Sequence, residues 1–129
     1  MSDATPRRVR ACRATDLVHG QMVVVPLTRV RDYIPREALV TRDDSGRIVA
    51  YRNECKHLPI PIDGMTRKFF DKEGTHLLCA LHGARYRVND GQCISGPCRG
   101  ASLEAVALEF DGDEVFVIDE LVNGAAGPT

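Results

Sequence analysis

The sequence contains no tryptophan, and aromatic residues make up only 5% of the chain. Platforms of stacked aromatic side chains that bind single-stranded nucleic acid are therefore not expected. Neither sign of charge dominates, because 17 lysine and arginine residues are balanced by 18 aspartate and glutamate residues. Nucleic-acid-binding proteins need a clustered basic excess, so the composition indicates neither DNA nor RNA as a partner.

The sequence also lacks a long hydrophobic run. Its longest strongly apolar stretch, residues 22–25, ends at Pro26. A membrane-spanning helix needs roughly 20 apolar residues, so no membrane segment is expected. Arg7 and Arg8 look like the start of a twin-arginine export signal, but no hydrophobic stretch follows them. We therefore expect a cytoplasmic protein, in which thiols stay reduced.

The chain is long enough for one domain with its own core. It has 129 residues, of which 43% are apolar and 27% are charged, an ordinary globular balance. We expect a disordered head over residues 1–7 and a flexible tail over residues 123–129. Between them we expect a single domain over residues 8–122, with an inserted subdomain at about 53–100.

Short segments rich in β-branched residues and bounded by turn residues dominate the sequence, a pattern typical of an all-β protein. Asn, Asp and Gly occupy the connectors, where tight turns need positive φ. No stretch shows ten residues of helical periodicity, so we expect little helix. Strands are predicted near residues 8–14, 21–27, 37–42, 47–52, 76–78, 85–88, 92–94, 103–109 and 114–118.

Three segments have features of their own. Hydrophobic alternation is poor over residues 103–109, so we expect that strand to be buried on both faces. Residues 28–36 are expected to form a surface loop. Residues 55–71 contain two prolines and a glycine, so they cannot be regular strand throughout.

Two short sequences each carry a cysteine followed closely by a histidine. Cys55 precedes His57, Cys79 precedes His82, and 21 residues separate the two pairs. Thiolate and imidazole suit iron, zinc or copper, and they do not suit magnesium or calcium. Five cysteines in a chain expected to keep its thiols reduced also favour metal binding over a disulfide framework. Two loops with the same ligand types predict one metal centre held between them.

A structural zinc ion is one alternative for this set of two cysteines and two histidines. Zinc fingers usually pair cysteine with cysteine and histidine with histidine, whereas each pair here is mixed. In a Rieske [2Fe–2S] centre, one iron takes two cysteines and the other takes two histidines. Two loops that each give one ligand to each iron satisfy that arrangement. A chance occurrence of four unrelated residues is the remaining alternative.

The residues around the second pair resemble a known family. Residues 79–97, which read CALHGARYRVNDGQCISGP, resemble the second cluster loop and the proline loop of the Rieske ferredoxins, and residues 55–58 resemble the first loop. The resemblance implies an all-β fold, an antiparallel β-sandwich base with an inserted two-loop cluster-binding subdomain. It also implies one [2Fe–2S] cluster held by four residues: Cys55, His57, Cys79 and His82.

The chain departs from the high-potential members of that family, those of cytochrome bc complexes. They carry a further cysteine in each loop, where this chain has Ile60 and Leu81, and a serine where it has Ala84. Fewer hydrogen bonds to sulfur stabilise a reduced cluster less, so we expect a potential near the low end of the roughly −150 to +300 mV range. Tyr86 keeps the family's aromatic position and is expected to donate to a cysteine sulfur. The spacer at 58–78 is long and predicts an extra turn or hairpin.

The remaining cysteines and histidines are interpreted as structural. Cys93 and Cys98 bracket the proline loop, and a disulfide between them would stiffen it. The expected cytoplasmic setting favours two thiols instead. Cys12 is interpreted as a small core residue. His19 and His76 are interpreted as structural or solvent-facing.

The resemblance implies a one-electron carrier and not an enzyme, because protein ligands fill every iron position and leave no substrate site. We expect a ferredoxin that receives electrons from a flavin-dependent reductase and passes them to a terminal oxygenase. No catalytic domain is expected after residue 124. An accessory subunit of a larger oxidoreductase, such as nitrite reductase, is an alternative, and a zinc-stabilised interaction module is a third.

Overall fold

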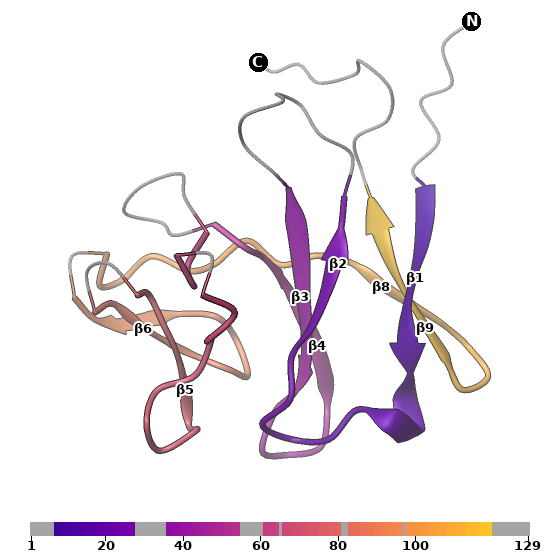
Figure 1. Cartoon of the computed structure of the whole chain (residues 1–129), viewed down its shortest axis with the longest axis horizontal. Helices are drawn as coiled ribbons and strands as arrows, with labels where there is room; N and C mark the ends of the chain where they lie inside the picture. Colours follow the sequence, from indigo (N-terminus) through magenta and orange to yellow (C-terminus); the bar gives the residue numbers. More distant parts are fainter. Residues whose placement is uncertain are drawn as a thin grey trace, which may run out of the picture.

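Antiparallel sheet is the main regular structure of the described chain, with 47% strand against 3% helix (Figure 1), which confirms the predicted all-β fold. The only helix in this part is one 3₁₀ turn, Ala14–Asp16. The computed structural model describes residues 7–27, 36–54, 61–64, 66–80, 83–96 and 98–119. The strands in these ranges are β1 (Arg7–Arg13), β2 (Val23–Pro26), β3 (Glu37–Arg42), β4 (Ile48–Arg52), β5 (His76–Leu78), β6 (Arg85–Arg87), β7 (Cys93–Ser95), β8 (Leu108–Asp111) and β9 (Glu114–Asp119).

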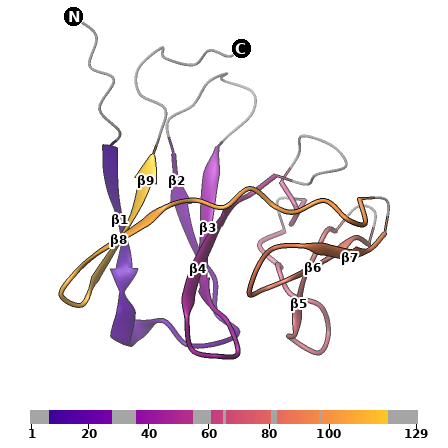
Figure 2. The ribbon, with the colours of Figure 1, turned by 180° about the vertical axis from the view of Figure 1, so that it is seen from behind.

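These strands form three sheets of three strands each. The strand orders are β1–β9–β8, β2–β3–β4 and β5–β6–β7, and every neighbouring pair is antiparallel. Figures 1 and 2 show the β2–β3–β4 sheet between the other two, with β5–β7 at one end of the molecule. The β5–β6–β7 sheet is built from residues between β4 and β8, so it is an insertion into the other two sheets.

Strand β3 is buried on both faces. Ala38, Leu39, Val40 and Thr41 are all completely buried. Ala38 and Val40 pack in the core that the middle sheet shares with β9, whereas Leu39 packs in the core shared with the β5–β6–β7 sheet. Full burial of an aliphatic side chain stabilises a fold by about 1.5–3 kcal/mol. The middle sheet is therefore the common wall of two hydrophobic cores.

The prediction that residues 103–109 form a strand buried on both faces is wrong. Strand β8 begins only at Leu108, and most of its residues are exposed, with Phe110 53% exposed. Before β8, the chain makes an isolated bridge from Ala105 to Tyr51. Because β8 is an edge strand with β9 as its single neighbour, the poor alternation reflects an irregular crossing segment and not burial on both faces.

The long spacer contains the extra hairpin that its length predicts. Phe70 forms an isolated antiparallel bridge with Leu77 at the start of this hairpin. Its turn is closed by a hydrogen bond of 2.9 Å from the backbone N–H of Gly74 to the carbonyl of Asp71. The hairpin therefore continues into β5, the strand that leads to Cys79.

Tyr51 fastens the middle sheet to the inserted sheet. Its hydroxyl donates to the carbonyl of Val88 at 2.7 Å, and both residues are buried. The ring lies against the backbone at Gly91, where a Cβ would come within 2.7 Å of Tyr51 Cε1. Gly91 also has a φ of 75°, in the region that glycine adopts readily. Burial raises the pKa of Tyr51 to about 12.

Replacing Tyr51 with phenylalanine is expected to lower the free energy of unfolding by about 1–3 kcal/mol, because it leaves the buried Val88 carbonyl without its donor. The folded-state pKa of Tyr51 lies above its ordinary value of 10.0. The contribution of its protonated hydroxyl to the free energy of unfolding is therefore complete below pH 10 and is lost as the pH rises toward 12. Urea unfolding of both proteins between pH 7 and 11 measures the difference. Equal stability at pH 7, or an equal alkaline loss in both proteins, would contradict the prediction.

No helix within the described ranges is long and apolar enough to cross a membrane. Most of the predicted 28–36 loop lies outside those ranges, as do most of the predicted head and tail. Arg36, the last residue of that loop, has a nearly buried side chain and forms an ion pair of 3.3 Å with Asp119 at the end of β9.

Candidate metal centre

Of the four predicted ligands, only Cys79 falls within the described part of the chain. Cys55, His57 and His82 lie outside the described residues, so their roles stay predictions from the sequence. Cys79 is completely buried and directly follows β5. The structure therefore informs the site through Cys79 and through the segments that flank the other three residues.

Cys79 begins a tight turn whose backbone is fixed by two hydrogen bonds. Its N–H donates to the carbonyl of Ala84 at 2.8 Å, and its carbonyl accepts from the N–H of Gly83 at 2.9 Å. Gly83 has a φ of 72°, a left-handed conformation that residues with a Cβ rarely adopt. The cysteine is thus presented by a backbone with little freedom to move.

The segments that border the two predicted loops lie side by side. The N–H of Ala80 donates to the carbonyl of Ile62 at 2.7 Å, and a Cβ on Gly64 would lie 3.4 Å from the Cβ of Ala80. Ile62 follows shortly after residues 55–60, and Ala80 directly follows Cys79. The end of the first predicted loop is therefore adjacent to the start of the second, as a shared metal centre requires.

Asn53 joins the chain before residues 55–60 to the chain after them. Its Oδ1 accepts from the N–H of Ile62 at 2.8 Å. Its Nδ2 donates to Glu37 Oε1 at 3.0 Å and to Asp63 Oδ1 at 3.2 Å. One buried side chain makes all three bonds, so it holds the two ends of the first predicted loop close together.

Arg67 extends this anchor. Its guanidinium donates to both oxygens of Glu37, at 3.1 and 3.0 Å, and its N–H donates to the completely buried Asp63 at 2.8 Å. The hydrogen bonds from Arg67 hold the pKa of Glu37 below its ordinary value. Arg67 itself has a φ of 64°, which is uncommon for a residue with a Cβ, and these bonds hold it there. No local pattern marks this network, because Arg67 and Glu37 are 30 positions apart.

Replacing Asn53 with aspartate is expected to destabilise the protein by at least about 2 kcal/mol at pH 7, because two donor bonds become contacts between carboxylates. The two neighbouring carboxylates raise the pKa of the introduced group, so the deficit is largest above that pKa and shrinks as the pH falls through it. Chemical denaturation at pH 7 and pH 5 measures both effects. Asn89→Asp, in an exposed turn, is the matched control, and equal losses in the two variants would contradict the role of Asn53.

Gly96, directly after β7, packs against the turn at Cys79. It has a φ of 96°, and a Cβ there would lie 2.7 Å from the Cα of Ala84 and 3.1 Å from its Cβ. Ala84 is completely buried, and its carbonyl accepts the hydrogen bond from Cys79. The proline loop of the sequence prediction therefore contacts the second predicted loop directly.

Tyr86 is expected from the sequence to donate to a cysteine sulfur of the cluster, and that expectation stays a prediction. Its hydroxyl lies 2.9 Å from Sγ of Cys98, which is not one of the predicted ligands. Sγ of Cys98 in turn lies 3.2 Å from Sγ of Cys93, and both residues are present as thiols. A contact of Tyr86 with Cys55 would fall outside the described residues.

The remaining cysteine and histidines of the described chain, Cys12, His19 and His76, lie in surroundings that indicate no metal site. Cys12 is partly buried and packs against the core between the first two sheets. His19 is exposed, and Nδ1 of His76 lies 2.9 Å from Thr75 Oγ1 and 3.4 Å from Asp71 Oδ2. Within the described ranges, which omit three of the predicted ligands, no group of three or more His, Cys, Asp or Glu side chains is arranged to hold a metal ion.

The chemistry of Cys79 fits an iron–sulfur cluster. Cysteine thiolates are the usual ligands of such clusters. An uncompensated thiolate is costly to bury, and coordination to iron removes that cost. The complete burial of Cys79, its fixed backbone and the adjoining flank of the other loop are therefore all compatible with the donor set that the sequence predicts.

The fold and the surroundings of Cys79 define an antiparallel β protein with a cysteine-bearing insertion between two strands of its base. The family model for the Rieske [2Fe–2S] domain matches residues 7–118. The chain therefore belongs to the Rieske [2Fe–2S] domain family. Its cofactor is accordingly a [2Fe–2S] cluster.

Similar proteins include carriers, subunits and oxygenases. The menaquinol:cytochrome c reductase iron-sulfur subunit of Geobacillus thermodenitrificans is 30% identical over 83 residues, which cover 64% of this chain and 47% of that protein. The chain thus spans about half the length of this curated relative. The ferredoxin of carbazole 1,9a-dioxygenase from Nocardioides aromaticivorans IC177 is 29% identical with a TM-score of 0.56, covering 88% of this chain and 96% of the ferredoxin.

The terminal oxygenase of carbazole 1,9a-dioxygenase from the same organism shares the fold. It has a TM-score of 0.62 at 19% identity, and the match covers 93% of this chain but 32% of the oxygenase. At that identity the likeness concerns the fold alone. The β-sheet base and its insertion are therefore an architecture common to carriers and to one part of larger enzymes.

Proposed function

We propose that this chain is a ferredoxin that carries single electrons from a flavin-dependent reductase to a terminal oxygenase. The observation that supports this role is the match to the carbazole 1,9a-dioxygenase ferredoxin, which extends over 96% of that ferredoxin at 29% identity. Among the similar structures are complexes of an oxygenase with a ferredoxin, including one in the reduced state. By analogy with those complexes, the acceptor of this chain is an oxygenase. The cytoplasmic location is proposed from the sequence, in which no hydrophobic stretch follows Arg7 and Arg8.

The proposal includes the ligand set and the limits of the domain. Cys55 and Cys79 would hold one iron through their thiolates, and His57 and His82 would hold the other through their imidazoles. The domain would extend over residues 8–122, with its cluster-binding part at about 53–100. When bound, the cluster supplies a one-electron couple.

The residues around Cys79 indicate how this chain would determine the reduction potential of the cluster. The hydrogen bonds to Ala84 and Gly83 hold the Cys79 backbone in one conformation, and Gly96 covers the turn from the proline loop. Ala84 has no hydroxyl to donate to sulfur, which supports a potential near the low end of the roughly −150 to +300 mV range of Rieske centres.

Spectroscopy of the purified protein tests the proposal. We expect a red-brown protein with equal amounts of iron and acid-labile sulfide, an EPR signal of the Rieske type after reduction, and a low potential in a redox titration. A colourless protein that contains zinc would overturn the cluster assignment. Reduction of an oxygenase by the prereduced protein tests the ferredoxin role, and a carrier that fails to reduce any oxygenase would contradict it.

A subunit of a larger oxidoreductase is the second candidate. The similarity to the menaquinol:cytochrome c reductase iron-sulfur subunit favours it. A ferredoxin forms short-lived complexes, whereas a subunit remains in a stoichiometric assembly. Purification of the tagged protein from its own cells, followed by size-exclusion chromatography and mass spectrometry, separates the two. A stable complex with a catalytic subunit would favour the second candidate.

A further inference from the structure

We propose that Cys93 and Cys98 form a reversible dithiol–disulfide site beside the turn that carries Cys79. Their sulfur atoms lie 3.2 Å apart, although neither belongs to the predicted ligand set. A disulfide has a sulfur–sulfur distance of about 2.05 Å, so bond formation requires the atoms to approach by about 1 Å. The proposal does not depend on the ferredoxin role.

The two thiols differ in access. Cys98 keeps 8% of its surface exposed, whereas Cys93 keeps 1%. Burial raises the pKa of Cys93 to about 11, so little of it is thiolate near neutral pH. An oxidant in solution therefore meets Cys98 first, and Cys93 acts as the resolving thiol from inside the core.

A line of hydrogen bonds runs through the pair. Sγ of Cys98 donates to Sγ of Cys93, and Sγ of Cys93 donates to the carbonyl of Ser95 at 3.2 Å. On the other side, the hydroxyl of Tyr86 lies 2.9 Å from Sγ of Cys98. Oxidation removes both S–H donors, so the bond to Ser95 is lost and Tyr86 faces a disulfide sulfur in place of a thiol.

The position of the pair connects it to the metal centre. The ring that the disulfide would close contains Gly96, which contacts Ala84 at a distance that leaves no room for a Cβ. The carbonyl of Ala84 in turn accepts a hydrogen bond from the N–H of Cys79. Oxidation or reduction of Cys93 and Cys98 therefore affects the backbone conformation at Cys79.

The chemistry takes place in two balanced steps with a low-molecular-weight disulfide as the oxidant. The Cys98 thiolate attacks one sulfur of the oxidant, which forms a mixed disulfide and releases one thiolate. The Cys93 thiolate then attacks Sγ of Cys98 and expels the second thiolate. The protein loses two electrons and two protons, and the oxidant is reduced to two thiols.

Peptide mapping of the holoprotein tests the proposal, because trypsin releases both cysteines in one peptide, residues 88–99. The protein is incubated in buffers of oxidised and reduced glutathione, quenched with N-ethylmaleimide in acid, denatured and digested. We expect this peptide to change from two alkylated thiols to a form without alkylation as the buffer becomes more oxidising, and to recover both thiols with dithiothreitol. The change is expected to be faster at pH 9 than at pH 7, since Cys93 must ionise.

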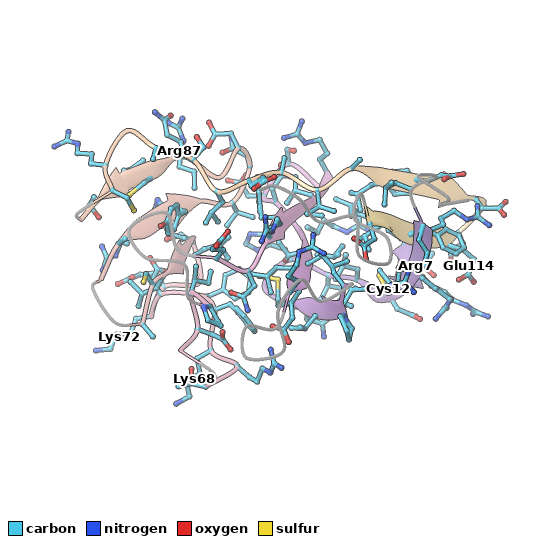
Figure 3. The ribbon with its side chains drawn as sticks, turned by 90° about the horizontal axis from the view of Figure 1, so that it is seen from above. Arg7, Cys12, Lys68, Lys72, Arg87 and Glu114 are labelled. Atoms are coloured by element: carbon cyan, nitrogen blue, oxygen red, sulfur yellow. The ribbon has the colours of Figure 1, made fainter. Side chains whose placement is uncertain are left out.

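Single variants assign the two roles. In Cys93→Ser, glutathione is expected to remain attached to Cys98, because the resolving thiol is missing. In Cys98→Ser, Cys93 is expected to stay unmodified, because it is inaccessible. Cys12→Ser is the matched control, since Cys12 lies in β1 at the end of the molecule away from Arg87 (Figure 3). It is expected to form the disulfide as the wild type does.

Two results would overturn the proposal. One is a wild-type peptide that keeps both thiols in the most oxidising buffer while the folded protein retains its absorption spectrum. The other is a stable glutathione adduct on Cys98 in the wild type, which would show that Cys93 does not resolve it. Because both readouts are masses of a peptide without predicted ligands, they stay interpretable even if the electron-carrier proposal fails.

Discussion

Replacing Cys79 with serine is expected to reduce the iron content of the purified protein to about zero, because a cluster that loses one of two thiolates on the same iron is not retained. The serine is nearly isosteric and Cys79 is completely buried, so the sheets themselves should still form. Iron and sulfide analysis measures the loss. Far-ultraviolet circular dichroism checks that the β fold is present.

The five cysteines provide their own controls. Cys55→Ser is expected to lose iron in the same way, whereas the variants Cys12→Ser, Cys93→Ser and Cys98→Ser are expected to keep it. Full iron content in Cys79→Ser would remove this residue from the ligand set. A folded Cys93→Ser variant that lacks iron would show that the cluster uses a different pair of sulfurs.

Replacing Gly96 with alanine is expected to destabilise the protein by about 2–5 kcal/mol. Part of the loss is the backbone cost of a side chain at a φ of 96°, about 1–2 kcal/mol, and the rest is overpacking against the Cα of Ala84, about 1–3 kcal/mol. Since Ala84 holds Cys79, the variant is also expected to release iron faster than the wild type. Urea unfolding and the decay of the visible spectrum under a chelator measure the two effects.

Gly100 is the matched control for Gly96. It has a φ of 94°, but nothing lies within 4 Å of where its Cβ would be. Gly100→Ala therefore carries the backbone cost alone and is expected to release iron at the wild-type rate. If the two alanine variants are equally destabilised and equally stable toward the chelator, the contact of Gly96 with Ala84 does not support the metal centre.

The strands that could be predicted from the sequence are those whose pattern is local. The bounds of β3 and β5 coincide with the predicted ranges 37–42 and 76–78, because turn residues lie at their ends: Pro35 and Asp43 flank β3, and Gly74 precedes β5. The range 103–109 was predicted wrongly. Ala105 pairs with Tyr51 through an isolated bridge and not as part of a continuous strand ladder. Burial on both faces occurs in β3, the central strand of its sheet. The hydrophobic periodicity of a single strand does not predict its position in the sheet.

For the candidate site, residues close in sequence were predictable and residues brought together from a distance were not. The spacing of Cys79 and His82 is a local feature that indicates metal ligands and resembles one family. The bond of Asn53 to Ile62 and the ion pair of Arg67 with Glu37 depend on the packing of the spacer against β3. Neither Asn nor Arg has a spacing that indicates such a partner, so these anchors emerge only from the folded chain.

The pairing of β1 with β9 sets the order in which this protein can assemble. Arg7 and Asp119 are register partners although 112 positions separate them, so this ladder requires closure of a very long loop and is entropically costly to begin. The β5–β6–β7 sheet uses neighbouring hairpins and can nucleate locally, whereas topologies dominated by distant pairings fold slowly. On the ribosome, the cysteine-bearing insertion emerges before β9 exists. A chain stalled before Glu114 would lack β9 and would expose the unpaired edge of β1 to aggregation.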